Sequence, residues 1–196
     1  MTLVELFDMN VEQRQKTLVA SQYAEQVLNL YQTQLEQDYL EDQFLDSLST
    51  ESIHQKVQHA VMDLTDEQAW MKALRILRAR LMFRWIWQDA NQLTNVVTLT
   101  RELSDFADAC ICAAKAFALV PLIAKHGEPI GYSGQVQDLI VIGMGKLGAQ
   151  ELNLSSDIDL IFAFDEQGET NGRKCIDVQQ FCILWGQKLI YLLDHI

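Results

Sequence analysis

Two aspartates spaced two residues apart, Asp157 and Asp159, open a strongly apolar segment of the chain. Side chains two apart in a β-strand point to the same face. We therefore expect both carboxylates on one face of a strand over 157–164, with Ile158 and Leu160 on the other face. Two charges at the end of a buried strand are costly unless they are neutralised. A pair of Mg²⁺ ions would neutralise them, because Mg²⁺ prefers a few carboxylates together with substrate phosphate oxygens.

A glycine-rich turn, Gly143-Met-Gly-Lys-Leu-Gly148, lies shortly before the aspartates. It follows a short apolar segment, 138–142, that predicts a buried strand, and residues 146–153 can form about two helical turns. Backbone N–H groups at the start of a helix attract anions. The candidates for holding a phosphate are therefore the glycines and the lysine of this turn, Gly143, Gly145, Lys146 and Gly148. A phosphate-binding turn beside a metal-holding aspartate pair is typical of phosphoryl or nucleotidyl transfer.

The same glycine spacing also matches a dinucleotide-binding (Rossmann) turn, with Asp165 near the position of a ribose-binding acid. That fold needs a crossover helix long enough to carry the chain past the whole sheet. Only eight residues separate Gly148 from Asp157, and part of that stretch is predicted to be a turn. Dinucleotide binding also leaves the two aspartates unexplained, so we favour phosphoryl or nucleotidyl transfer and keep the dinucleotide fold as the alternative.

Residues 1–128 are predicted to be almost wholly helical, with no glycine before Gly127. The segment Thr65-Asp-Glu-Gln68 matches a capping box. It opens a helix whose apolar stripe is Trp70, Leu74, Leu77, Leu81 and Trp85. A second stripe is Leu99, Leu103, Phe106, Cys110, Ala113 and Phe117. Pro121 is expected to bend or end that second helix, and an earlier amphipathic segment covers 22–48.

A linker over 125–134, with three glycines and one proline, separates this region from residues 136–196. The last segment predicts a helix from about Asp177, with an apolar stripe of Val178, Phe181, Cys182, Trp185, Leu189, Leu192 and Leu193. We expect this helix to run to Ile196 and its stripe to lack covering strands, which would leave an incomplete domain with an exposed apolar face. The predicted fold class is α+β.

Composition narrows the choice of partners and compartment. The chain carries 15 Lys and Arg against 27 Asp and Glu, a formal net charge of −12, which argues against a nucleic-acid partner. We expect no signal peptide at its start, and no membrane span, because its most apolar stretch, 107–124, is interrupted by Asp108, Lys115 and Pro121. The four cysteines lack zinc-ligand spacing. Free thiols in a reducing, cytoplasmic setting are therefore predicted.

Five basic residues gather within thirteen positions, Lys72, Arg75, Arg78, Arg80 and Arg84. They could contact an anionic partner or a nucleotide. The interpretation that we favour is pairing with an acidic segment that matches them in number, Glu36, Asp38, Glu41, Asp42 and Asp46.

The segment 143–162, Gly-Met-Gly-Lys-Leu-Gly-Ala-Gln-Glu-Leu-Asn-Leu-Ser-Ser-Asp-Ile-Asp-Leu-Ile-Phe, strongly resembles the signature of glutamine synthetase adenylyltransferases, also called glutamate–ammonia ligase adenylyltransferases. The resemblance covers most of the chain from about Asp63. That family carries two DNA polymerase beta-like nucleotidyltransferase domains, one of which removes AMP from glutamine synthetase by phosphorolysis while the other attaches it. The helical lead-in and the Gly-Met-Gly turn fit the amino-terminal, adenylyl-removing half better. The family usually has glycine where Ala149 stands.

The resemblance implies roles for particular residues and partners. Asp157 and Asp159 would be catalytic residues that hold Mg²⁺, and Gly143, Gly145, Lys146 and Gly148 would hold phosphate, with Ser155 and Ser156 supporting the start of the aspartate strand. The superfamily usually offers a serine where Lys146 stands, and it completes the metal site with a third carboxylate on a later strand that this chain does not reach. The implied partners are glutamine synthetase, AMP, ADP or ATP, phosphate, and a PII-type signal protein.

Two alternatives to this reaction remain open at the level of sequence. The chain could act only as a non-catalytic helical interaction module, because the third carboxylate is not reached. It could also belong to a nucleotidyltransferase that acts on another substrate class, such as a uridylyltransferase or an antibiotic nucleotidyltransferase.

Overall fold

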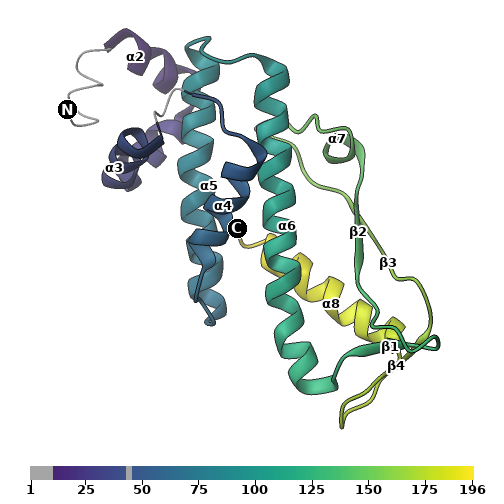
Figure 1. Cartoon of the computed structure of the whole chain (residues 1–196). Helices are drawn as coiled ribbons and strands as arrows, with labels where there is room; N and C mark the ends of the chain where they lie inside the picture. Colours follow the sequence, from purple (N-terminus) through teal and green to yellow (C-terminus); the bar gives the residue numbers. More distant parts are fainter. Residues whose placement is uncertain (1–10, 43–45) are drawn as a thin grey trace. The chain divides into compact units, whose positions relative to one another are not determined.

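Helices account for the first part of the chain and short strands appear only later, as the computed structural model shows for residues 11–42 and 46–196 (Figure 1). The helices of the first part are α2 (Val11–Ala20), α3 (Gln22–Asp42), α4 (Thr50–Val61), α5 (Glu67–Ala90) and α6 (Val96–His126). The chain divides into two compact units, one that ends at Asp105 and one that spans Phe106–Ile196. The boundary lies within α6. The assignment of 1–128 and 136–196 as domains stays a prediction.

In the first unit, α2, α3 and α4 all pack against α5. The predicted stripe of α5, from Trp70 to Trp85, is buried throughout, which confirms the periodicity. The helix begins one residue later than predicted, because the cap is Asp66 and not Thr65. Its carboxylate accepts a hydrogen bond from the Ala69 amide at 2.8 Å. Aspartate is the stronger N-cap of the two, and its negative charge also favours the helix N-terminus.

Buried polar contacts hold the first turns of α6 in this unit. Glu102 is 3% exposed and accepts hydrogen bonds from Trp85 Nε1 at 2.8 Å and from the Leu48 amide at 2.9 Å. Asp105 accepts a hydrogen bond from the Thr50 hydroxyl at 2.8 Å. Burial raises the pKa of Glu102, against the lowering effect of the Trp85 hydrogen bond. These contacts join α6 to α5, to the start of α4 and to the segment before it.

Two of the five basic residues on α5 contact residues of the predicted acidic segment. Arg80 pairs with Asp38, with Nε 2.8 Å from Oδ2. Arg84 is buried and donates to the main-chain carbonyl of Asp46. Lys72, Arg75 and Arg78 are exposed on α5. The side chains of Glu36, Glu41 and Asp42, which were also predicted as partners, lie outside the described ones.

In α6, Pro121 does not end the helix, and the later part of the predicted apolar stripe was wrong. The helix continues through Pro121 to His126. The turn after the proline is anchored from both sides, because Gly127 donates to the Ile123 carbonyl at 2.8 Å and His126 Nδ1 lies 2.7 Å from the Lys174 carbonyl oxygen. The buried stripe also advances by four residues after Cys110, to Ala114 and Ala118, where the prediction had Ala113 and Phe117.

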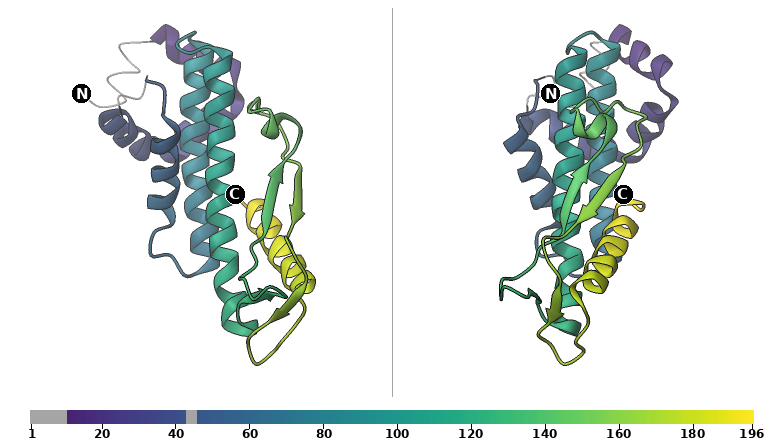
Figure 2. Two further views of the ribbon diagram at one scale, coloured as in Figure 1. Left: turned by 45° about the vertical axis from the view of Figure 1, so that its right-hand side comes forward. Right: turned by 90° about the vertical axis from the view of Figure 1, so that its right-hand side faces the viewer.

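The second unit contains two small antiparallel sheets. Strand β1 (Pro129–Gly131) pairs with β4 (Gly168–Thr170), and β2 (Ile140–Gly143) pairs with β3 (Leu160–Ala163). A single helical turn, α7 (Gly145–Gly148), follows β2, and α8 (Val178–Leu193) closes the chain. Figure 2 shows β2 and β3 running side by side, with α8 beside them. The α+β class is confirmed, although the predicted linker contains β1 and the predicted two-turn helix has only one turn.

The apolar stripe of α8 is buried, contrary to the expectation that it would be exposed. Phe181 and Leu189 are fully buried, and Trp185 is 2% exposed. The indole Nε1 of Trp185 donates to the Lys115 carbonyl at 2.8 Å, and α8 also contacts β1 and β4. The stripe is therefore covered by elements of this unit. The helix ends at Leu193, before the predicted end at Ile196.

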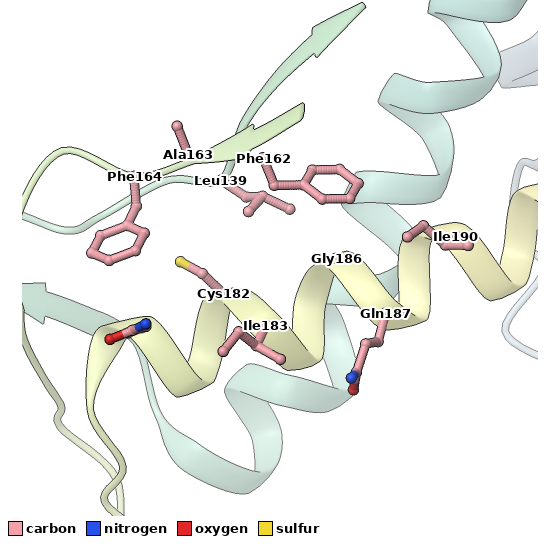
Figure 3. Close-up of a pocket in the computed structure, with 10 residues that line it drawn as sticks. Leu139, Phe162, Ala163, Phe164, Cys182, Ile183, Gly186, Gln187 and Ile190 are labelled. Carbon is pink, nitrogen blue, oxygen red and sulfur yellow. The ribbon is translucent and has the colours of Figure 1, made fainter. Parts of the chain in front are cut away.

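A small apolar groove of about 380 Å³ lies between β3 and α8 (Figure 3). Phe162 points from the strand toward the helix, where Gly186 allows a close approach: a Cβ there would lie 3.2 Å from Phe162 Cδ2. Cys182 lines the same groove, and burial raises the pKa of its thiol to about 11. The four cysteines are free thiols, as predicted.

Candidate active site

The glycine turn connects β2 directly to α7, and its three glycines are needed for different reasons. A Cβ at Gly143 would lie 2.9 Å from the Leu147 side chain, and a Cβ at Gly148 would lie 2.5 Å from the Gly143 carbonyl oxygen. Gly145 has a φ of +54°, and apart from its chain neighbours and the backbone of its own helix no atom lies within 4 Å of a hypothetical Cβ. The left-handed backbone at position 145 therefore favours glycine, and the space beside this residue is open.

A main-chain hydrogen bond connects the glycine turn to the aspartate pair. The Met144 amide donates to the Asp159 carbonyl at 2.9 Å, one step beyond the β2–β3 ladder, in which Gly143 is paired with Leu160. The aspartates themselves precede β3, which begins at Leu160 and not at Asp157 as predicted. The reason is that β2 ends at Gly143, so the residues before Leu160 have no partner strand. Turn and aspartates nevertheless meet at one end of the hairpin.

Both aspartate side chains are exposed. Among the described residues, none donates a hydrogen bond to either carboxylate or forms an ion pair with it. Two unpaired carboxylates are suitable ligands for a hard cation such as Mg²⁺, which keeps several waters and takes other oxygens from substrate phosphates. Within the described ranges, no cluster of three or more His, Cys, Asp or Glu residues is arranged to hold a metal. The metal assignment of Asp157 and Asp159 stays a prediction.

Lys146 is exposed on α7, and its ammonium group donates to the Ser156 hydroxyl at 3.3 Å. That hydroxyl in turn donates to Asn153 Oδ1 at 2.8 Å. The backbone amide and the hydroxyl of Ser155 also donate to Asn153 Oδ1, at 3.1 and 3.2 Å. The loop 153–156 therefore brings both predicted serines and the predicted lysine together around one asparagine.

Asn153 was not among the predicted site residues. The sequence did indicate a turn at this position, and an asparagine at the first position of a turn commonly hydrogen-bonds the backbone two residues on. That signal marks the turn, but it does not show which side chain from another element reaches it. The contact with Lys146 follows only from the way in which α7 and the loop fold back on each other.

The antiparallel pairing of β2 and β3 contradicts the dinucleotide alternative. A Rossmann unit places its first two strands in parallel, joined by a crossover helix. Here the connection contains only the single turn of α7, and Asp165 follows the far end of β3, away from the glycine turn (Figure 1).

Among the described helices, α6 is long and apolar enough to cross a membrane, with a mean hydropathy of 1.8 in its most apolar window. Core helices of soluble proteins also meet this criterion. Three polar side chains of α6 are paired within the protein: Glu102 and Asp105 accept the hydrogen bonds described above, and Lys115 pairs with Asp138 at 2.6 Å. In the structure, 39% of that apolar window is buried.

The chain matches a family model described as glutamate-ammonia ligase adenylyltransferase over residues 11–196. It is 78% identical over 190 residues to a bifunctional glutamine synthetase adenylyltransferase/adenylyl-removing enzyme of Acinetobacter baylyi, covering 97% of this chain and 21% of that protein. Relatives with the same description in Thioalkalivibrio sulfidiphilus and Pseudomonas aeruginosa are 46% and 44% identical, over 71% and 74% of this chain and 14% and 15% of their own lengths. The chain thus spans about a fifth or less of these relatives. It belongs to the glutamate-ammonia ligase adenylyltransferase family.

Proposed function

We propose that this chain forms part of the adenylyl-removing half of a bifunctional enzyme that regulates glutamine synthetase. Residues 136–196 would be the first part of a polymerase beta-like nucleotidyltransferase domain. The observation that carries the proposal is the hydrogen bond from the Met144 amide to the Asp159 carbonyl at 2.9 Å. It fixes the glycine turn beside the aspartate pair, which is the arrangement that nucleotidyl transfer requires. The relatives, which are bifunctional glutamine synthetase adenylyltransferases/adenylyl-removing enzymes, agree with this reaction class.

Asp157 and Asp159 would hold Mg²⁺, with the third carboxylate supplied by another segment of the parent protein. When bound, Mg²⁺ would supply positive charge that stabilises the negative charge on the phosphate oxygens. The fit rests on two exposed carboxylates to which no described residue donates. Gly143, Gly145 and Gly148 would shape the turn whose amides face a phosphate, and the Lys146 ammonium would add a charged donor.

The proposed reaction is phosphorolysis of the tyrosyl-AMP ester on glutamine synthetase. An oxygen of inorganic phosphate attacks the α-phosphorus, a new P–O bond forms, and the bond to the tyrosine oxygen breaks. The products are ADP and the tyrosine phenolate, which takes a proton from water. Because the pKa of tyrosine is only about 10, this leaving group needs little acid assistance. The turn and Lys146 hold the attacking phosphate in line with the bond that breaks.

The proposed partners follow from this reaction. They are glutamine synthetase, AMP, ADP or ATP, inorganic phosphate, and a PII-type signal protein that would regulate the parent enzyme. The net charge of −12 favours protein and nucleotide partners over nucleic acid. We place the protein in the cytoplasm, without a membrane partner, because its four cysteines are free and Glu102, Asp105 and Lys115 of α6 are paired within the protein.

The test uses a chimera in which this chain replaces the matching segment of the Acinetobacter baylyi relative, a conservative exchange at 78% identity. With adenylylated glutamine synthetase and Mg²⁺, we expect ADP release that depends on phosphate. Asp159→Asn should slow this release by about a thousandfold, the scale seen when a group that stabilises transition-state charge is removed. Its effect on substrate binding should be much smaller.

Three outcomes would contradict the proposal. Release of AMP without a phosphate requirement would make this segment part of a hydrolase. Full deadenylylation with Asp159→Asn, together with loss of AMP transfer from ATP to glutamine synthetase, would assign the segment to the other activity. A chimera whose two activities are both unaffected by Asp157→Asn and Asp159→Asn would support the non-catalytic interaction module.

A further inference from the structure

We propose that Asn153 is a positioning residue for Lys146 and acts through the hydroxyl of Ser156; the inference rests on the proposed function, in which Lys146 binds phosphate. Asn153 lies in the connection between α7 and β3, and Lys146 lies on α7. The two residues are joined by two consecutive hydrogen bonds, from Lys146 Nζ to Ser156 Oγ at 3.3 Å and from Ser156 Oγ to Asn153 Oδ1 at 2.8 Å.

The orientation of the Asn153 amide is fixed by its surroundings. The backbone N–H of Ser155 lies 3.1 Å from Oδ1 and can only donate, so the oxygen and not the nitrogen of the amide must face it. The Ser156 amide also donates to the Asn153 carbonyl at 3.2 Å, which closes the turn. The side chain and the main chain of Asn153 therefore both hold Ser156.

The Ser156 hydroxyl is fully used in this arrangement. A serine hydroxyl has one proton and two lone pairs. The proton is directed to Asn153 Oδ1, and the lone pairs accept from the Asn153 amide at 3.2 Å and from Lys146 Nζ. Ser156 therefore has no hydrogen left to donate to a phosphate. Its role is to fix the lysine, and the ammonium group keeps two further donors for phosphate oxygens.

An asparagine suits this task better than an aspartate would. Lys146 is an exposed side chain with four rotatable bonds, and without a restraint it would lose much conformational freedom on binding an anion. A neutral acceptor at 153 holds the lysine in place without neutralising its charge. A carboxylate would accept the same hydrogen bonds, but it would compete with phosphate for the ammonium group and add charge near Asp157 and Asp159.

The test is a double-mutant cycle on ADP binding by the chimera, measured by calorimetry with EDTA present so that metal plays no part. Asn153→Leu and Ser156→Ala should each raise the dissociation constant for ADP about tenfold, because the lysine must then be ordered on binding. Lys146→Met should raise it at least as much. In the Lys146→Met background, Asn153→Leu should have no further effect, and Ser156→Thr, which keeps the hydroxyl, should bind ADP like the parent chimera.

Asn171→Ala is the matched control, because Asn171 Oδ1 accepts a backbone hydrogen bond from Glu128 at 2.9 Å in the same unit. It should lower the melting temperature without changing ADP affinity. An equal effect of Asn153→Leu with and without Lys146 would overturn the positioning role, and so would unchanged affinity in Asn153→Leu and Ser156→Ala variants that keep their circular-dichroism spectra. If the effects of Asn153→Leu and Lys146→Met on ADP binding are coupled but the chimera lacks phosphorolysis, only the proposed function is refuted. A chimera that binds no ADP would overturn both the positioning role and the proposed function.

Discussion

Substitutions of Gly145 can separate two effects, the conformational cost of a side chain at this position and the loss of space for a ligand. Its φ of +54° lies in the left-handed region, and no atom outside its chain neighbours and the backbone of α7 lies within 4 Å of a hypothetical Cβ. A side chain at this position therefore meets no steric obstacle in the folded protein, and its only cost is conformational. For a residue such as alanine that cost is about 1–2 kcal/mol. At about 2–4 °C per kcal/mol for a chain of this length, Gly145→Ala should lower the melting temperature by a few degrees.

Asparagine changes the balance, because it adopts the left-handed region far more readily than alanine does. Gly145→Asn should therefore be closer to wild type in stability than Gly145→Ala, although its side chain occupies more of the open space. If a phosphate lies in that space, Gly145→Asn and Gly145→Val should both abolish ADP binding, and the helical circular-dichroism signal should stay largely intact. Thermal unfolding and ADP calorimetry on the same samples measure the two effects independently.

Two results would refute this reasoning about Gly145. Equal stability of the alanine and asparagine variants, or no loss in either, would show that the positive φ is not what requires glycine. Normal ADP affinity in Gly145→Asn would show that the ligand does not use the open space beside the turn, and the phosphate-binding role of the turn would then be lost.

Three further predictions concern the metal, the core and a buried acid. Mg²⁺ should bind this chain only weakly, with a dissociation constant on the order of millimolar, and the double substitution Asp157→Asn/Asp159→Asn should remove the binding in calorimetry; unchanged affinity would exclude the pair as ligands. Trp185→Phe should lower the free energy of unfolding in urea by about 2–3 kcal/mol, because the Lys115 carbonyl loses its buried donor and a cavity remains; a change below about 0.5 kcal/mol would contradict that packing. The raised pKa of Glu102 means that the folded protein binds this proton more tightly than the unfolded chain, so the contribution of Glu102 to stability is largest below its ordinary value of 4.5 and falls as pH rises through the raised pKa. Glu102→Gln should flatten this pH dependence in chemical unfolding measured from pH 4.5 upward, and an unchanged slope would contradict the shift.

The helical part of the fold could be predicted where the signal is local. The stripe on α5 follows from a 3.6-residue period, and it is buried as predicted from Trp70 to Trp85. The two failures on α6 and α8 have a different origin. The helix that continues through Pro121 ends at His126, which contacts the Lys174 carbonyl, and the buried Trp185 donates to a carbonyl 70 residues away in sequence. Periodicity shows which face of a helix is apolar, but it does not show what covers that face.

The same distinction holds for the candidate site. The predicted residues fall within 143–159, so the hairpin that joins β2 to β3 brings them together through short-range connections. The start of β3 was misplaced because it is set by where its partner strand ends, which is a property of two segments and not of one. The link between Asn153 and Lys146 was missed for a related reason, since it requires the loop to fold back onto α7.

The direction of strand pairing explains why one glycine pattern could suggest two different sites. In a parallel unit, a glycine turn at the end of the first strand lies at the opposite edge of the sheet from the start of the next strand. Residues at that start could then never share a ligand with the turn. In an antiparallel pair, the end of the first strand and the start of the second are neighbours, as the bond between Met144 and Asp159 shows. An aspartate pair at the start of the second strand can thus act with the turn only in the antiparallel arrangement, and the short connection between Gly148 and Asp157 already favours that arrangement in the sequence.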